Sequence, residues 1–211
     1  MLKIVFLLLL SFFFSMQAKS EEILLTDKVK EIPAHSSILI CDSRIIFENI
    51  VNEMIYEFPD ASQLNSLFVA EAKNAIASSN AQINIIDKTS AINTVYQPHC
   101  QELSGLAKKL ALGQLDDYAY KILKKLSASN KNIYVLSHEL YAKTGPGGSW
   151  DPYSGAISST SSVARYRISL IDCQTGEVIW KNEKYIRKIP DYKSTKFIGF
   201  IRMALEGTKK H

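Results

Sequence analysis

The side chains best suited to catalysis lie in two stretches near the end of the chain. Ser137 and His138 are adjacent in "IYVLSHELY", and Asp172 ends "ISLID". A histidine with a carboxylate partner can activate a hydroxyl nucleophile, so a small hydrolase using His138 and Asp172 is one hypothesis. Adjacent residues on a strand point to opposite faces, however, which separates Ser137 from His138. A histidine on an apolar strand face is more often a core residue, and we expect this of His138.

Three cysteines, Cys41, Cys100 and Cys173, allow one disulfide and leave one thiol over. Cys41 ends one predicted strand and Cys100 lies just beyond another, so in a parallel arrangement both lie at the same edge of the sheet. Cys41 with Cys100 is therefore the first choice of pairing, and three buried unpaired thiols are the alternative. The cysteine spacing matches no zinc or redox motif, and we expect no metal and no cofactor.

A segment rich in Gly, Pro and Ser, residues 145–155, connects two predicted strands. It has no Gly-Lys-Ser or Gly-Lys-Thr ending and leads into a strand, so it is not a phosphate loop. Trp150 and Tyr153 stand beside prolines in this segment and suit a contact surface. The alternative is an ordinary structured loop that folds Trp150 over its own edge.

Basic residues gather on the hairpin that follows this loop. One interpretation of Arg165, Arg167 and Lys181 is a solvated outer face with cross-strand pairs to Glu183. The other is a surface for an acidic partner or an anionic glycan. The hypothetical partner-binding residues are Trp150, Tyr153, Arg165, Arg167 and Lys181.

Residues 161–187 give the clearest local structure signal, two β-branched and aromatic runs separated by a tight turn at 174–176. Gly176 supplies the positive φ that a three-residue turn needs, and Asp172 is a turn-forming residue. This geometry predicts three cross-strand pairs: Leu170 with Trp180, Ile171 with Ile179 and Arg167 with Glu183.

The remaining elements follow from the spacing of apolar residues. We expect an irregular or edge segment over 21–36 and strands over 36–43, 83–86 and 132–144. Helices are expected over 45–57, 62–79, about 103–110, about 118–126 and the C-terminus after Ser194, and the pair near 103–126 is either two consecutive helices or one kinked helix. Asp116 is placed to cap the helix near 118–126. These elements predict an α/β fold: a single mixed sheet of about five strands with helices packed on it, ending in a hairpin and a terminal helix.

Residues 1–20 have the pattern of an export signal. Lys3 precedes an apolar core, and Ala18 and Ser20 fit a cleavage site, so we expect cleavage after Ser20. The alternative is a membrane anchor, but the apolar run over 4–16 is shorter than the roughly 17 to 25 residues that a spanning helix needs. No cysteine follows the apolar core, so no lipid anchor is expected.

Residues 21–211 are expected to form one α/β domain. Losing Lys3 and Lys19 lowers the formal charge from +4 to +2. A nearly neutral domain gives no reason to expect nucleic acid. The mature chain is therefore expected to be periplasmic or secreted.

The strand "IYVLSHELY", the loop and "SSVARYRISLIDCQTGEVIW" resemble a known periplasmic α/β domain. This domain is shared by the CsgG family, PelC-type polysaccharide export lipoproteins, lipoprotein activators of penicillin-binding proteins and the N-terminal domain of TolB. The matching residues are Arg167, Leu170, Asp172, Thr175, Gly176, Glu177, Val178 and Trp180.

The resemblance implies a non-enzymatic binding or assembly component of a bacterial envelope, with an envelope protein or glycan as its partner. It carries over no catalytic residues, and a homo-oligomer is compatible with it. The small hydrolase and a secreted protein acting on a host are the alternatives.

Overall fold

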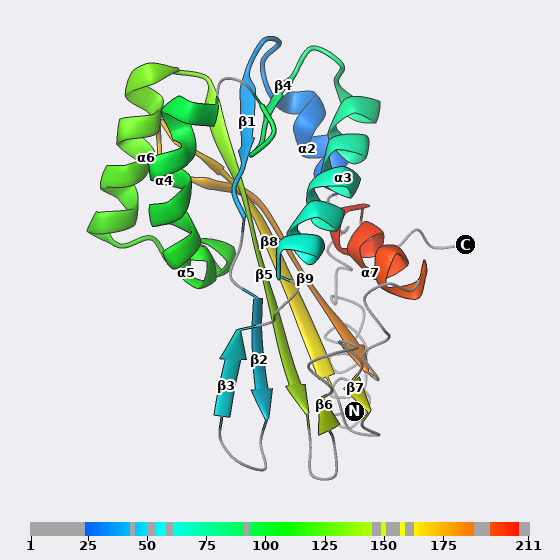
Figure 1. Ribbon diagram of the computed structural model, residues 1–211. Coiled ribbons are helices and arrows are strands. Elements are labelled where there is room, and N and C mark those ends of the chain that lie inside the picture. Colours follow the sequence, from blue (N-terminus) through cyan, green and yellow to red (C-terminus); the bar gives the residue numbers. More distant parts are fainter. Residues whose placement is uncertain are drawn as a thin grey trace, which may run out of the picture.

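The computed structural model describes residues 24–42, 45–49, 54–57, 61–90, 93–144, 149–150, 157–158, 163–187 and 195–206 (Figure 1). The expected signal sequence and Tyr153 lie outside these residues. The strands are β1 (Ser37–Ile40), β2 (Ile45–Asn49), β3 (Met54–Glu57), β4 (Asn84–Ile86), β5 (Ile133–Thr144), β6 (Ser149–Trp150), β7 (Ile157–Ser158), β8 (Val163–Asp172) and β9 (Val178–Arg187). The helices are α2 (Leu25–Glu31), α3 (Ala61–Ser79), α4 (Asn93–Gly105), α5 (Ala107–Leu112), α6 (Asp117–Ser129) and α7 (Thr195–Glu206).

Strand β5 organises the sheet. Its first half pairs in parallel with β1 and its second half in parallel with β2, while β8 runs antiparallel along its other edge. On the outer side of β1, β4 pairs with it in parallel. Strand β3 pairs antiparallel with β2, and β9 pairs antiparallel with β8. The α/β class, the mixed sheet, the hairpin and the terminal helix are confirmed. All five expected strands are present, and β2 and β3 add two more to the sheet.

The helix predicted over 45–57 is wrong, because β2 and β3 form there instead. Strand β5 is twelve residues long and extends past the four-residue β1. Its exposed edge beyond β1 leaves backbone N–H and C=O groups that need partners, and β2 supplies them. The helical spacing of apolar residues in this segment is overridden by pairing with a distant strand.

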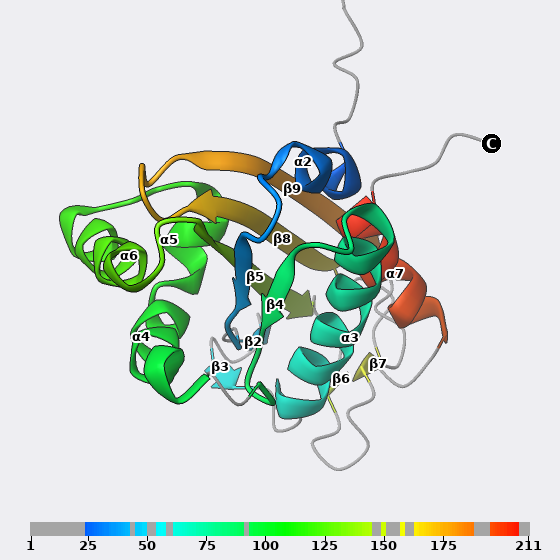
Figure 2. The same cartoon turned by 90° about the horizontal axis from the view of Figure 1, so that it is seen from above.

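The helices cover the two faces of the sheet as separate groups. Helices α4, α5 and α6 lie on one side, and α2, α3 and α7 on the other (Figure 2). Leu136 and Leu140 of β5 belong to the core cluster that includes Phe68 of α3, whereas Val135 belongs to a second cluster with Leu123 of α6. The alternation of faces predicted for β5 is therefore confirmed.

Local signals predicted the helices unevenly. Helix α3 and α6 form where expected, and the Asp116 side chain accepts a hydrogen bond from the Ala119 N–H at 2.9 Å, as an N-cap does. The irregular segment predicted over 21–36 is wrong in part, since α2 forms there. Leu25 and Val29 lie one turn apart on α2 and are fully buried.

The hairpin register is nearly the predicted one. Two of the three predicted pairs are present, Arg167 with Glu183 and Leu170 with Trp180. Ile171 pairs with Val178 rather than with Ile179, because a bulge shifts the register just after Leu170. A bulge adds one residue to one strand, which local sequence spacing does not reveal.

The hairpin turn depends on Asp172 and Gly176. The Asp172 carboxylate accepts hydrogen bonds from the N–H groups of Gln174 at 2.7 Å and Thr175 at 3.3 Å. Gly176 has a φ of 76°, as the turn requires, and its missing Cβ leaves room for the Tyr120 ring of α6. The turn is thus shaped locally and also packed against a helix.

Candidate functional site

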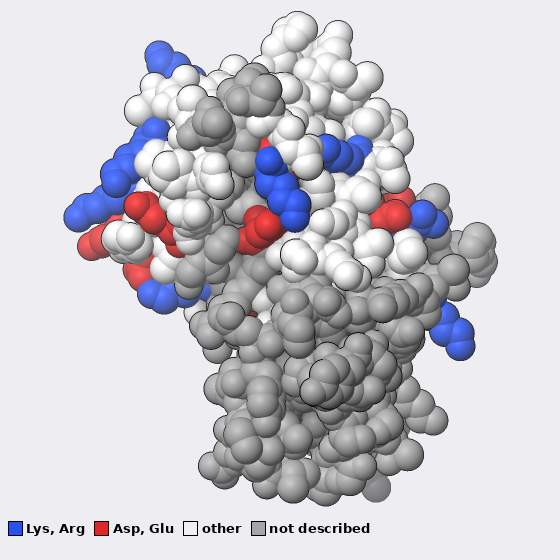
Figure 3. Space-filling view, viewed as in Figure 1, with Lys and Arg blue, Asp and Glu red and all other residues white. Residues whose placement is uncertain are grey.

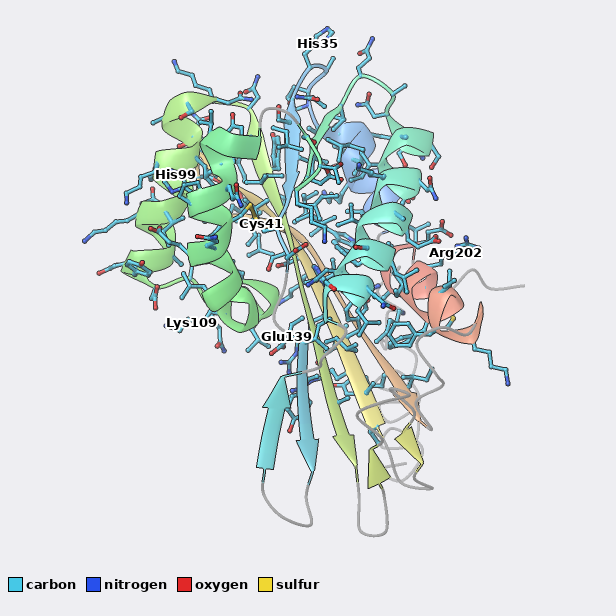
Figure 4. The ribbon with its side chains drawn as sticks, viewed as in Figure 1. His35, Cys41, His99, Lys109, Glu139 and Arg202 are labelled. Carbon is cyan, nitrogen blue, oxygen red and sulfur yellow. A yellow bond between two sulfur atoms is a disulfide. The ribbon has the colours of Figure 1, made fainter. Side chains whose placement is uncertain are left out.

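The face of the sheet on the α5 side is covered only along part of its length. Ser169 of β8 is buried under α5, where its hydroxyl donates a hydrogen bond to the Leu110 carbonyl at 2.8 Å. The next residues along the strands extend past α5, and Glu139 lies just beyond the end of that helix (Figure 4). Lys181, opposite Ser169 on β9, is exposed. Two rows of side chains follow, of which the first is mostly buried and the second is partly exposed.

The first of these rows, here named the ionic row, consists of Glu139, Arg167 and Glu183 on three adjacent strands. The Arg167 guanidinium donates to the Glu139 carboxylate at 3.1 Å and to the Glu183 carboxylate at 2.8 Å. Side-chain exposures are 2% for Glu139, 9% for Arg167 and 38% for Glu183. Burial alone would lower the pKa of Arg167, but the hydrogen bonds to Glu183 and Glu139 outweigh it and raise that pKa.

The position of Arg167 corrects one prediction. It was placed among the exposed basic residues of the hairpin, yet it is buried and shared between two carboxylates. The residue faces the expected side of the sheet, but Glu139 on β5 lies directly opposite and neutralises it. A pairing between Arg167 and Glu139 depends on two segments 28 residues apart.

The second row, here named the Tyr–Arg row, consists of Tyr141, Arg165 and Tyr185. The Arg165 guanidinium carbon lies 5.4 Å from the centre of the Tyr141 ring, a cation–π distance. Its Nε lies 3.3 Å from the Glu183 carboxylate but makes no hydrogen bond, although this nitrogen is buried. Tyr185 is 63% exposed.

Together the Tyr–Arg row and Lys181 form what we call the open face. Tyrosine and arginine are over-represented at the energetic centres of protein interfaces, because they combine a large apolar area with directional donors. Arg165 is partly exposed, and Lys181 adds a second, exposed cation on the neighbouring strand. The open face therefore has the chemistry to bind an acidic or carbohydrate group.

Sequence reasoning missed Tyr141 and Tyr185, although a signal for them existed. Once Arg167 is paired with Glu183, antiparallel register places Arg165 opposite Tyr185 two residues further along. Across the charged surface seen in Figure 3, Lys and Arg are interspersed with Asp and Glu. Charge composition alone therefore does not single out the open face.

Of the two loop aromatics predicted to bind a partner, Trp150 is placed by the pairing of its backbone. Trp150 lies in β6, opposite Ile157 of β7. The β6–β7 ribbon lies at the end of the sheet where β5 ends and β8 begins (Figure 1). Tyr153 and the rest of 151–156 lie outside the described residues.

His138 is a buried core residue in contact with α3. Its ring stacks on Phe68 with the ring centres 3.8 Å apart, and its Nδ1 lies 3.0 Å from the Tyr166 hydroxyl. Burial lowers the pKa of His138 to about 3, so the ring is neutral at ordinary pH. The core location expected for His138 is confirmed.

His138 and Asp172 are not brought together. Asp172 is opposite Tyr134, four residues before His138 along β5, which corresponds to about 13 Å at the rise of a strand. The Asp172 carboxylate is occupied by the hairpin turn, and Ser137 lies on the other face of β5. The hydrolase hypothesis based on this pair is therefore wrong.

A disulfide joins the segment after β1 to helix α4. Cys41 forms a disulfide with Cys100 of α4, with their Cα atoms 5.2 Å apart, which is the pairing put first from the sequence. Cys173 is free and fully buried, and burial raises the pKa of its thiol. In the described part of the chain, no three His, Cys, Asp or Glu side chains cluster as a metal site would require.

A second buried ion pair lies at the end of β4. The Asp87 carboxylate is 1% exposed and lies 2.5 Å from the Lys73 ammonium of α3. Burial would raise the pKa of Asp87, but the bonds from Lys73, Thr89 and Ser90 outweigh burial and lower it from 3.8 to about 2. Asp87 therefore ties α3 to the sheet and was not singled out from the sequence.

No family model and no curated protein sequence matches the chain. Solved structures do match it. The C-terminal domain of LpoB from Salmonella enterica is 16% identical, with a TM-score of 0.34, and the match covers 78% of this chain and 96% of that one. Lipoprotein GNA1162 from Neisseria meningitidis is 16% identical, with a TM-score of 0.37 and coverages of 81% and 94%.

The PelC dodecamer from Paraburkholderia phytofirmans is 15% identical, with a TM-score of 0.36 and coverages of 82% and 86%. PelC belongs to the group of proteins that the hairpin resembles in sequence. With TM-scores below 0.5, these likenesses assign the chain to no family. No helix among the described residues is long and apolar enough to cross a membrane.

Proposed function

We propose that this protein is an exported, non-enzymatic binding or assembly component of a bacterial cell envelope. In this proposal residues 1–20 are removed, and residues 21–211 act as one domain in the periplasm or outside the cell. The Cys41–Cys100 disulfide supports an oxidising compartment, because such bonds persist mainly in exported proteins. The sequence resemblance of the hairpin to the periplasmic domain supports the envelope role.

The single observation that carries the binding role is the Tyr–Arg row. Arg165 is held in place by Tyr141 and Glu183, yet its buried Nε has no hydrogen-bond acceptor. The Arg165 side chain is 29% exposed and lies opposite Tyr185, which is 63% exposed, so an incoming carboxylate or hydroxyl group can meet a cation and a tyrosine side by side. We propose that the open face contacts an envelope protein or glycan, and that Trp150 and Tyr153 extend the contact.

A photo-cross-linking amino acid at Tyr185, used in the native cell, tests this proposal. Tyr118 on α6 is the matched control, because the two tyrosines are 63% and 55% exposed and Tyr118 lies away from the open face. We expect an adduct with a different envelope molecule from Tyr185 and none from Tyr118. The adduct should be lost when Arg165→Gln is added.

Three outcomes would contradict the proposal: equal adducts at both positions, no adduct at either, or an adduct that Arg165→Gln leaves unchanged. An adduct that contains only a second copy of this chain would also count against it.

A further inference from the structure

Strand β9 is the last strand of the sheet, and its outer edge is the basis for this inference. In the described part of the chain β9 pairs with β8 along one edge and with no strand along the other, and α2 contacts part of β9. The strand has ten residues, roughly twice the usual length. A long free edge is a template for another strand unless it is blocked.

Among the symmetric registers centred on its four middle residues, 181–184, the β9 sequence favours one with a copy of itself. Antiparallel pairs alternate between two hydrogen-bonding types, so two strands related by a two-fold axis must place one residue opposite its own copy. If Lys181 or Lys184 lies opposite its own copy, two lysines repel each other across the axis. If Glu183 lies there, two glutamates do so. Choosing Asn182 instead places Lys181 of each copy opposite Glu183 of the other, so that both charges are matched.

Exposed apolar side chains lie near the same edge. Tyr185 is on β9, and Met203 of α7 is 44% exposed. The Asn182 amide donates to the Ala204 carbonyl at 2.8 Å, which holds the end of α7 beside the middle of β9. Arg202 binds Glu71 of α3, and the angle of about 100° between successive helical residues places Met203 on a different side of α7.

We propose that two copies of this chain associate through β9, with Asn182 opposite its own copy and the two sheets joined into one. Two Lys181–Glu183 pairs form across the axis, and Met203 of each copy lies close enough to the axis to cover the other's α7. Glu183 then bridges Arg167 of its own chain and Lys181 of the second copy. This association needs no other molecule, although it uses Lys181 of the open face for its own charge pair.

Sedimentation equilibrium of the purified mature chain tests the association without any other molecule. We expect a monomer–dimer equilibrium whose dissociation constant rises about tenfold or more in Lys181→Glu, because two attractive pairs become repulsive. Met203→Glu should weaken the dimer similarly. The matched controls are Lys125→Glu on α6 and Val95→Glu on α4, which change exposed residues elsewhere and should leave the constant unchanged.

Cysteine cross-linking tests the register. Asn182→Cys places two Cα atoms about 5 Å apart across the axis, within disulfide range. Lys181→Cys places them about 8 Å apart, beyond that range. We expect a covalent dimer from the first variant and not from the second. A monomer at all concentrations overturns the proposal, as does equal weakening by the control variants or a dimer that only Lys181→Cys cross-links.

Discussion

Removing one charge from the ionic row should destabilise the fold strongly. Glu139→Gln keeps the size of the side chain but leaves the buried Arg167 with Glu183 as its only anionic partner. Removing one partner of a buried ion pair costs about 3 to 5 kcal/mol when nothing compensates the remaining charge. Because Glu183 still compensates Arg167 from a position that is 38% exposed, we expect a loss of about 2 to 3 kcal/mol.

The same substitution at an outer ion pair provides the control. Glu71 binds Arg202 through two hydrogen bonds of 2.5 and 3.0 Å, but the Arg202 side chain is 58% exposed. Although the Glu71 side chain is only 13% exposed, water reaches the Arg202 guanidinium and can replace the lost carboxylate, so Glu71→Gln should lower the free energy of unfolding clearly less than Glu139→Gln. Urea denaturation of each mature variant, analysed with a shared slope, measures the difference.

A third variant separates the burial of charge from the packing of the side chain. Glu139→Met combined with Arg167→Met replaces the buried pair by apolar groups, which is often nearly neutral. The double variant should therefore be more stable than Glu139→Gln alone. If Glu139→Gln costs no more than Glu71→Gln, or if the double variant is the least stable, Arg167 does not depend on Glu139 for its charge compensation.

Three further predictions concern the elements that hold the sheet together. Replacing Cys41 and Cys100 by Ser removes a cross-link between residues 59 apart and should lower the free energy of unfolding by about 4 kcal/mol in urea titrations; no loss would mean that the disulfide is not formed in solution. The pKa of Asp87 is lowered to about 2 in the folded chain, so its stabilisation, about 2 kcal/mol, is complete above about pH 5 and is lost as the pH falls toward 2. Asp87→Asn should abolish this part of the acid dependence, and an unchanged pH profile would contradict the ion pair with Lys73. Gly176→Ala places a Cβ 2.8 Å from the Tyr120 ring at a φ of 76° and should cost about 1 to 3 kcal/mol by thermal unfolding. Adding Tyr120→Ala should relieve the clash with the ring but not the strain of the positive φ. If Gly176→Ala is as stable as the parent, the turn geometry assigned to Gly176 is wrong.

Local spacing was sufficient where one residue constrains its near neighbours. Asp172 and Gly176 shape a turn of a few residues, whereas the register that brings Arg167 opposite Glu183 also needs the bulge after Leu170. Asp116 likewise caps α6 through a contact three residues away. In such cases the interacting groups are adjacent in the chain, so the sequence shows both of them together.

Tertiary structure decided the features that depend on distant partners. Residues 45–57 have helical spacing, but the length of β5 beyond β1 draws them into β2 and β3. The same holds for Arg167, whose place in the hairpin was foreseen but whose burial depends on Glu139 from another strand.

The sequence by itself determined the α/β class, the hairpin with its turn, and the inward and outward faces of β5, because each follows from a short period or a local bond. Only the folded chain decided that Arg167 is neutralised between two carboxylates while Arg165 lies over the Tyr141 ring and stays partly exposed. Arg167 can be buried because Glu139 of β5 and Glu183 of β9 both compensate its charge, and pairing between strands far apart in the sequence brings these three residues together.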